Sequence, residues 1–455
     1  MSAAPLLSAN AAVATAPQRG TPSARPARPR RASVDDFHVS DPSLAPVAEK
    51  VRAGVPLSFE DGQALARSRD VWGIGRLANT VRERLHGDVT FYNRNRHINY
   101  TNVCALSCKF CSFYRKRGEA GAYEMPVEQV VATARKAWED GATEVHIVGG
   151  LHPWLKFDYY LDFLRGIRAE CPELHIKAFT AIEIVHFSRI GRMSIEEVLR
   201  QLKEAGLGSL PGGGAEIFDD RVHDQAFKGK VREDKWFEVH RTAHRLGLFS
   251  NATMLYGHLE GGDERVKHLI KLRDLQAQSL KAMGLDPDVP PSEATERRSD
   301  EATEGTEGKA NDASDPSSLR RSVASSLSAH ACFNCVIPLS FIPEHSELGH
   351  LPGPTGLTDL KTLAIARLLC NNIAHIKSFW IMQGVHLSQV ALNWGCDDLD
   401  GTVVWYDITK RQGLNGAGGG TQRQEMHVET LKRVIRDAGR TPVERDTLYR
   451  PIIRD

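Results

Sequence analysis

The sequence predicts an α/β protein, and more specifically a (β/α)8 TIM-like barrel. Between residues 91 and 455, short apolar segments typical of strands alternate with longer amphipathic segments typical of helices, and this alternation indicates a parallel sheet. Eight such units favour a barrel. An open doubly wound sheet is the alternative, but no G-x-G-x-x-G motif follows the first predicted strand.

The predicted strands and helices follow one another in regular order. The first barrel helix begins at Pro126 and stops at Gly141, since proline is tolerated at helix starts and glycine ends helices. Ser194 and Glu197 have the spacing of a capping box. The predicted strands span residues 96–101, 143–148, 175–180, 207–214, 248–257, 335–343, 374–382 and 400–406. The predicted helices between them span residues 126–141, 157–170, 194–206, 234–247, 265–276, 357–370 and 387–395.

Residues 1–45 differ in composition from the rest of the chain. They are rich in alanine, serine and proline, and five arginines but no acidic residue precede Asp35. This composition is typical of a transit peptide for a plastid or a mitochondrion, and a disordered tail is the alternative. We expect residues 46–90 to form a helical segment in front of the barrel.

A second unusual segment interrupts the predicted barrel at about residues 284–330. It is polar, rich in serine, glutamate and alanine, and almost free of large apolar side chains. Because it cannot bury enough surface to offset its ordering entropy, we expect a disordered surface insertion or an artefact of the gene model. Cys332 and Cys335 follow it directly; we expect buried thiols at a strand start, with a second cluster or redox pair as the alternative.

Composition and charge exclude several classes of function. The formal net charge of the 455 residues is +1, so no basic surface indicates a nucleic-acid partner. No apolar run approaches the ~18 residues that a membrane span needs. The content of 41% hydrophobic and 25% charged residues is typical of a soluble globular protein. Eight cysteines, three of them clustered, suit a reducing compartment with one metal or redox site.

The cysteine cluster consists of Cys104, Cys108 and Cys111, in the loop that leaves the first predicted strand. In a barrel this loop lies at the face where active sites form. A structural zinc takes four protein ligands, and a [4Fe–4S] cluster normally takes four cysteines. Three thiolates would anchor such a cluster and leave one iron open to a small molecule. The spacing therefore predicts a reactive iron–sulfur site, with structural zinc in a binding protein as the alternative.

The C-x3-C-x2-C spacing, with Phe110 before the third cysteine, resembles the signature of radical S-adenosylmethionine (SAM) enzymes. The resemblance implies that the open iron binds the amino and carboxylate groups of SAM, whose cleavage gives a 5′-deoxyadenosyl radical. It also implies that Phe110 lies near the adenine and that Gly149 and Gly150 lie near the methionine amino group. Thr180, at the end of the third predicted strand, is a further predicted cofactor contact.

A more specific resemblance runs from about Phe91 to Tyr449. The segments that carry it are HIVGGLHPWLKFDYY, HIKAFTAIEI, GLGSLPGGGAEIF, SNATMLYGH, DLDGTVV and AGRTPVERDTLY. Together they resemble the aminofutalosine synthases of the futalosine route to menaquinone. Dehypoxanthine futalosine cyclases and the deazaflavin (FO) synthase subunit share the PGGGAEI-like and GG-HP-like elements. The HIKAFTA and GRTPVERD segments favour the synthase over these two alternatives.

The resemblance to the synthases implies a reaction. The adenosyl radical would add to the vinyl carbon of 3-[(1-carboxyvinyl)oxy]benzoate. Aryl migration and loss of carbon dioxide would then give 6-amino-6-deoxyfutalosine and methionine, so that SAM is consumed as a co-substrate. An electron donor such as flavodoxin or ferredoxin is also implied. A barrel interior suits this chemistry because it keeps a radical away from water.

The two carboxylates of this substrate lead us to expect cations or hydrogen-bond donors inside the barrel. For Lys177 and Arg189 the favoured alternative is a charge that reaches solvent, and for Glu216 it is a helix cap. The glycines of residues 211–214 would let the backbone approach a ligand closely. The candidate residues for the catalytic site are His152, Lys177, Glu183 and His258, with Arg189 as a weaker candidate.

Overall fold

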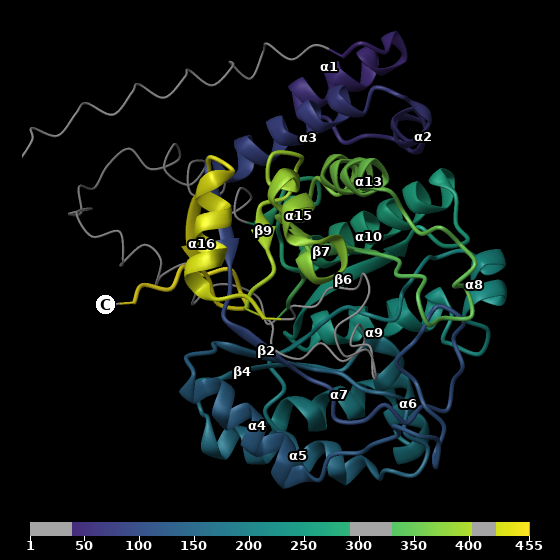
Figure 1. Cartoon of the computed structure of the whole chain (residues 1–455), viewed down its shortest axis with the longest axis vertical. Coiled ribbons are helices and arrows are strands. Elements are labelled where there is room, and N and C mark those ends of the chain that lie inside the picture. Colours follow the sequence, from purple (N-terminus) through teal and green to yellow (C-terminus); the bar gives the residue numbers. More distant parts are fainter. Residues whose placement is uncertain (1–38, 292–329, 403–424, 455) are drawn as a thin grey trace, which may run out of the picture. The chain divides into compact units, whose positions relative to one another are not determined.

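A computed structural model describes residues 39–291, 330–402 and 425–454 of the chain. Ten parallel strands form one sheet in the order β10-β1-β9-β8-β7-β6-β5-β4-β3-β2. Helices lie between successive strands and cover the outside of this sheet (Figure 1). The α/β TIM-like architecture predicted from the alternation is therefore confirmed, with two strands more than expected.

Eight strands correspond to the predicted ones, and most of them are shorter. The predicted strands run on into segments that leave the sheet at its carboxyl edge; at residues 211–214, Gly212 and Gly214 have φ of 81° and 94°, which strands do not adopt. The observed strands are β2 (Asn95–Ile98), β3 (Glu144–Ile147), β4 (His175–Ala178), β5 (Ser209–Leu210), β6 (Phe249–Tyr256), β7 (Phe333–Ser340), β8 (His375–Ser378) and β9 (Asp398–Leu399).

The two additional strands are β1 (Val89–Tyr92) and β10 (Thr441–Glu444), which pair with each other. β1 also pairs with β9, and only two residues separate it from β2. Thr402, just after β9, donates from its amide to Asn93 O (3.2 Å) and from its hydroxyl to Asn95 O (2.9 Å). The chain therefore links β9 to β2 through the junction of β1 and β2. The predicted eighth strand (residues 400–406) is misplaced, because β9 ends at Leu399 and residues 400–402 are not in a strand; residues 403–406 lie outside the described residues.

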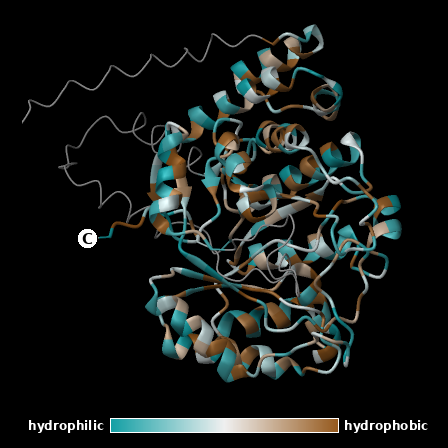
Figure 2. Ribbon diagram, in the orientation of Figure 1, coloured by the Kyte–Doolittle hydropathy of each residue, from teal (hydrophilic) through white to brown (hydrophobic). Residues whose placement is uncertain are grey.

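All seven predicted helices of the barrel are present, together with four in the described residues that were not predicted. Ser194 accepts a hydrogen bond from the amide of Glu197 (3.1 Å), but Glu197 accepts from Gln201 (2.7 Å), so half of the predicted capping box is present. Hydrophobic and hydrophilic residues alternate along the helices, which lets each bury one face (Figure 2). The predicted helices are α4 (Val127–Glu139), α5 (Phe157–Glu170), α7 (Ile195–Glu204), α9 (Glu233–Arg245), α10 (Gly262–Ala282), α13 (Gly356–Leu369) and α15 (Val385–Ala391). The helices not predicted are α6 (Ala181–Gly191), α8 (Asp220–Ala226), α14 (Trp380–Gln383) and α16 (Val428–Asp437).

The segment in front of the sheet is helical. It contains a 3-10 turn (Pro42–Leu44) and the helices α1 (Ala45–Ala53), α2 (Phe59–Arg67) and α3 (Val71–His86). α3 packs against α13, and α2 packs against α10. Among the described helices, none combines the length and apolar character needed to cross a membrane. The predicted transit peptide lies almost wholly, and the predicted insertion largely, outside the described residues.

The hydrophobic core lies between the sheet and its helices. Tyr160, Phe163, Phe179 and Phe187 are fully buried, and their rings contact one another next to β4, α5 and α6. Cys332 and Cys335 are buried free thiols at the start of β7, as predicted. This packing fixes the strands and leaves their carboxyl ends to shape a site.

Candidate active site

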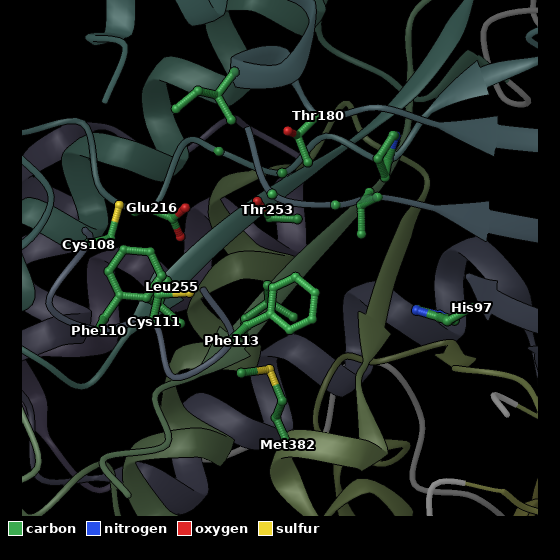
Figure 3. Close-up of a pocket in the computed structure, with 18 of the residues that line it drawn as sticks. His97, Cys108, Phe110, Cys111, Phe113, Thr180, Glu216, Thr253, Leu255 and Met382 are labelled. Atoms are coloured by element: carbon green, nitrogen blue, oxygen red, sulfur yellow. The ribbon is translucent and has the colours of Figure 1, made fainter. Parts of the chain in front are cut away.

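A cavity of about 420 Å³ lies at the carboxyl ends of the strands. This volume is in the range of small-molecule sites. Cys108, Phe110 and Cys111 lie on one side of the cavity, and His97 of β2 lies on the other (Figure 3). The cavity therefore joins the cysteine loop to the inside of the sheet.

Cys104, Cys108 and Cys111 all line the cavity and are free thiols. Backbone hydrogen bonds hold their loop: the amide of Cys104 donates to Arg115 O (3.1 Å), and that of Ala105 donates to Leu151 O (2.8 Å). The ammonium of Lys116 donates to the carbonyl groups of residues 104, 105 and 106 at 3.1, 3.3 and 2.9 Å. The protein's own hydrogen bonds thus hold the cysteine loop in place.

The surroundings of the three sulfur atoms suit an iron–sulfur cluster better than a single ion. The amides of Leu106 and Leu151 both lie 3.4 Å from Cys104 Sγ, and such donors stabilise cluster thiolates. Thiolates around one zinc ion lie about 2.3 Å from the metal and close together. Within the described ranges, the one group of three possible ligand atoms within 4.8 Å of one another is elsewhere: His86, His375 and Asp397. The three cysteines do not form such a group.

Burial also controls the ionisation of these thiols. It raises the pKa of Cys108 to about 12, although the ammonium of Lys230 opposes the shift. Burial likewise raises the pKa of Cys111. Because thiolates are the metal-binding form, the two buried cysteines need a bound positive centre in order to ionise.

Gly149 and Gly150 line the cavity directly after β3. A Cβ atom on Gly150 would lie 2.4 Å from the carbonyl oxygen of Val103, and one on Gly149 would lie 2.7 Å from the Tyr100 ring. Neither contact is possible, so any side chain here would push the cysteine loop or β2 away. The glycine pair thus has a packing role in addition to the predicted cofactor contact.

Thr180 and Glu183 line the cavity at the start of α6 and form a complete capping box. Glu183 accepts hydrogen bonds from the Thr180 amide (2.7 Å), the Tyr100 hydroxyl (2.7 Å) and the Gly149 amide (3.1 Å). Burial raises the pKa of Glu183, although these donors oppose the shift. Glu183 therefore joins the exits of β2, β3 and β4 at the wall of the cavity.

Two of the favoured alternatives are wrong: that the charge of Lys177 reaches solvent, and that Glu216 caps a helix. Lys177 does not reach solvent: its side chain is 4% exposed, and its ammonium lies 2.7 Å from Glu144 Oε2. Glu216 does not cap a helix but forms an ion pair with Lys230, whose ammonium also lies 5.2 Å from the centre of the Phe110 ring. All of these residues line the cavity.

His152, His258 and Arg189 do not line this cavity. The His152 ring accepts from the amide of Leu155 (3.1 Å) and pairs with Glu124 (2.8 Å), so it holds the loop after β3. His258 Nε2 lies 3.1 Å from Leu255 O, within its own turn. Arg189 is exposed on α6, as the favoured alternative predicted.

Several cavity residues were not predicted from the sequence. Lys377 of β8 forms an ion pair with Asp400 (2.7 Å), and the His97 ring contacts the His146 ring in a tilted arrangement with centroids 4.3 Å apart. A signal was available for Lys377, since HIKSF at residues 375–379 repeats the HIKAF of residues 175–179. Side chains two residues apart on a strand share a face, so each of these lysines faces the same way as the histidine two positions before it.

Comparison with known proteins agrees with this geometry. Residues 98–273 match the family model "Radical SAM superfamily". The chain is 41% identical over 418 residues to the aminodeoxyfutalosine synthase of Thermus thermophilus, covering 91% of this chain and 97% of that one. The corresponding protein of Streptomyces coelicolor is 40% identical over 413 residues (88% and 92%). The chain belongs to the aminodeoxyfutalosine synthase family of the radical SAM superfamily.

Other radical SAM enzymes are more distant from this member of the aminodeoxyfutalosine synthase family. A 5-amino-6-(D-ribitylamino)uracil–L-tyrosine 4-hydroxyphenyl transferase of Methanopyrus kandleri is 32% identical over 419 residues, covering 90% of this chain and 98% of that one. The crystal structure of methylornithine synthase (PylB) superimposes with a TM-score of 0.58 at 16% identity (87% and 97% covered), which supports the fold. The cofactors of the superfamily are a [4Fe–4S] cluster and SAM.

Proposed function

We propose that this protein is an aminodeoxyfutalosine synthase of menaquinone biosynthesis. It would convert SAM and 3-[(1-carboxyvinyl)oxy]benzoate into 6-amino-6-deoxyfutalosine, methionine and carbon dioxide. The observation that carries the proposal is the identity of about two residues in five along nearly the whole length of two synthases. The hydroxyphenyl transferases are less similar, at 32%, 34% and 34% identity for three of them.

In this proposal Cys104, Cys108 and Cys111 hold the cluster. On reduction, the cluster and SAM together supply a 5′-deoxyadenosyl radical. The residues around the cysteine loop fit this role: Lys116 fixes the loop backbone, and two amides face Cys104 Sγ. One iron of the cluster stays open when the protein supplies only three ligands. The three cysteines that line the cavity meet this condition.

The cofactor contacts in the proposal are Phe110, Gly149, Gly150 and Thr180, which all line the cavity close to the cysteine loop or the strand exits. Phe110 presents an aromatic face, and the glycines expose backbone to a ligand. Glu183 holds Gly149 and Thr180 in place through its hydrogen bonds. The apolar wall of Leu255, Phe113 and Met382 excludes water from the space between these groups (Figure 3).

Two further parts of the proposal concern the cell. A low-potential electron donor such as flavodoxin or ferredoxin would reduce the cluster. The arginine-rich segment without acidic residues before Asp35 would direct import into a plastid or a mitochondrion.

The test is a reaction under strict anaerobic conditions with the reconstituted full-length protein. One mixture contains SAM, a chemical reductant and 3-[(1-carboxyvinyl)oxy]benzoate; a second contains SAM, reductant, tyrosine and 5-amino-6-(D-ribitylamino)uracil. The proposal predicts a benzoate-containing nucleoside in the first mixture and no new product in the second. Product in the second mixture alone would assign the protein to the transferases instead.

A further inference from the structure

The deep end of the cavity is unusually rich in buried charge. We call it the floor: the lining residues within β2, β3, β4 and β8 or beside β9, which are Asn95, His97, Glu144, His146, Lys177, Lys377 and Asp400. His97, His146 and Lys177 stand level with one another on β2, β3 and β4. Lys377 stands next to β9 on the other side of the cavity. Two ammonium groups therefore face one space from opposite walls of the sheet.

Each of these lysines is held by one carboxylate of its own wall. Lys177 donates to Glu144 Oε2 and Lys377 donates to Asp400 Oδ1, both at 2.7 Å. An ammonium has three N–H donors, so within the described ranges each pair uses one and leaves two. Buried donors require acceptors. The floor thus presents more N–H groups to the cavity than its own carboxylates satisfy.

The charges of the floor are fixed by residues behind it. Arg445 donates to Asp398 Oδ2 (2.9 Å), so Asp398 is neutralised by a partner other than Lys377. Thr447 donates to Glu144 Oε2 (2.5 Å), the oxygen that also receives Lys177. Burial lowers the pKa of His97 to about 4, which favours the neutral form of its ring.

The segments involved are the ones that separate the synthases from their relatives in the sequence analysis. Lys177 belongs to HIKAFTA and Arg445 belongs to GRTPVERD, and Thr447 directly follows the second segment. Lys177 and Thr447 are 270 residues apart in the sequence, and both donate hydrogen bonds to Glu144 Oε2.

We propose that Lys177 and Lys377 bind the ring carboxylate of the substrate, a meta-substituted benzoate. This inference rests on the proposed function. The alkene of the substrate must lie beside the cofactor, which is held at the cysteine side of the cavity. The ring carboxylate is at the other end of the molecule and therefore points to the floor (Figure 3). The aryl ring lies between them, against Phe379 and Ile337, which also line the cavity.

The test compares two ligands and two proteins. The ligands are 3-[(1-carboxyvinyl)oxy]benzoate and 2-phenoxyacrylate, which lacks only the ring carboxylate. The variant is Lys377→Met with Asp400→Asn, because Lys377→Met alone would leave a buried unpaired carboxylate. Binding is measured by anaerobic calorimetry on the reconstituted protein, and circular dichroism and the cluster absorbance confirm that the variant folds. Arg200→Met, on the exposed face of α7, is the matched control.

Loss of a charged hydrogen bond should weaken binding of the benzoate by about 10- to 100-fold in the double variant. Binding of 2-phenoxyacrylate should stay unchanged, and the control should bind both ligands like the wild type. Equal weakening of both ligands, or of neither, would overturn the inference. If the wild type bound and converted the benzoate but the variant did so equally well, the inference alone would fail. If the wild type bound neither ligand, the proposed function would fail as well.

A variant that does not fold is replaced by Lys377→Arg, which keeps the charge but moves the donors and should weaken binding of the benzoate only.

Discussion

The hydroxyl of Tyr100 donates a hydrogen bond of 2.7 Å to Glu183 Oε1, and this bond joins the exit of β2 to the first turn of α6. Both residues are fully buried. Glu183 also receives the amides of Gly149 and Thr180. One carboxylate thus sets the positions of three strand exits that line the cavity beside the cysteine loop.

Tyr100→Phe should lower the free energy of unfolding by about 1–3 kcal/mol, since it removes a donor to a buried carboxylate. The matched control is Tyr160→Phe: Tyr160 Oη is buried and has no hydrogen-bond partner in the described part of the chain. Urea denaturation of both variants checks the prediction. Equal effects of the two substitutions would show that the Tyr100–Glu183 bond does not stabilise the site.

Gly150→Ala should displace the cysteine loop. Its Cβ would lie 2.4 Å from Val103 O and 3.1 Å from Cys104 Cβ, and the first of these neighbours is backbone that cannot rotate away. We expect a lower content of iron and sulfide after anaerobic reconstitution. Gly356→Ala is the control, because its Cβ would meet only Leu387 at an ordinary 3.6 Å. A normal iron content in Gly150→Ala would mean that the loop and β3 are not coupled.

Replacing any of Cys104, Cys108 and Cys111 by serine should abolish cluster binding, because each thiolate would hold a different iron. Cys335→Ala should lower stability by roughly 1 kcal/mol and leave the iron content unchanged, since Cys335 is fully buried in the core away from the loop. Iron and acid-labile sulfide analysis decides between these outcomes. Cluster loss in Cys335→Ala, or retention in any of the three serine variants, would contradict the assignment.

The sequence predicts the cysteine loop well because its signal is local. The three cysteines and Phe110 lie within eight residues, and a loop after a strand must lie at the carboxyl edge of a parallel sheet. The alternation of strands and helices is equally local, and it predicts eight of the ten strands. β1 and β10 were missed because each has only four residues and gains its partner from a segment about 350 residues away. Pro442 within β10 also removes a donor and lowers any strand signal.

The polar floor could not be predicted because its residues depend on partners distant in sequence. The sequence around Lys177 favours a lysine that reaches solvent. Its partner Glu144, and Thr447 that bonds the same Glu144 oxygen, are known only from the structure. His152 reads as a ligand because it follows two glycines, but the turn at Pro153 directs it to Glu124. Thr180 and Glu183 have the T-x-x-E spacing of a capping box, but Thr180 was assigned to the end of the predicted strand 175–180, and the helix that it caps, α6, was not predicted.

Stability should fall in mild acid because several histidines are buried without charge. Burial lowers the pKa of His244 to about 3, whereas the unfolded chain titrates near 6.5. The unfolded state therefore binds more protons below pH 6.5, and stability is present above that pH and lost as the pH falls, at about 1.4 kcal/mol per pH unit for each such group. His268 behaves in the same way, and burial lowers the pKa of His97 to about 4.

The measurement is the free energy of unfolding between pH 7.5 and 5 for the wild type and His244→Gln. The free energy of unfolding of the variant should depend less steeply on pH, because its unfolding takes up about one proton fewer at the acidic end of this range. Because every other group is shared, the difference isolates His244. An identical slope would mean that His244 is charged in the folded protein.

The central claim is that the cysteine-lined cavity uses SAM as a substrate whose adenosyl group joins the enolpyruvyl benzoate. The direct test supplies SAM carrying ¹³C at C5′ to the reduced, reconstituted protein together with 3-[(1-carboxyvinyl)oxy]benzoate, and follows the label by mass spectrometry and NMR. The account predicts that the labelled carbon is bonded to a carbon of the former vinyl group in the nucleoside product. Recovery of all the label in free 5′-deoxyadenosine, with the benzoate unchanged, would contradict it.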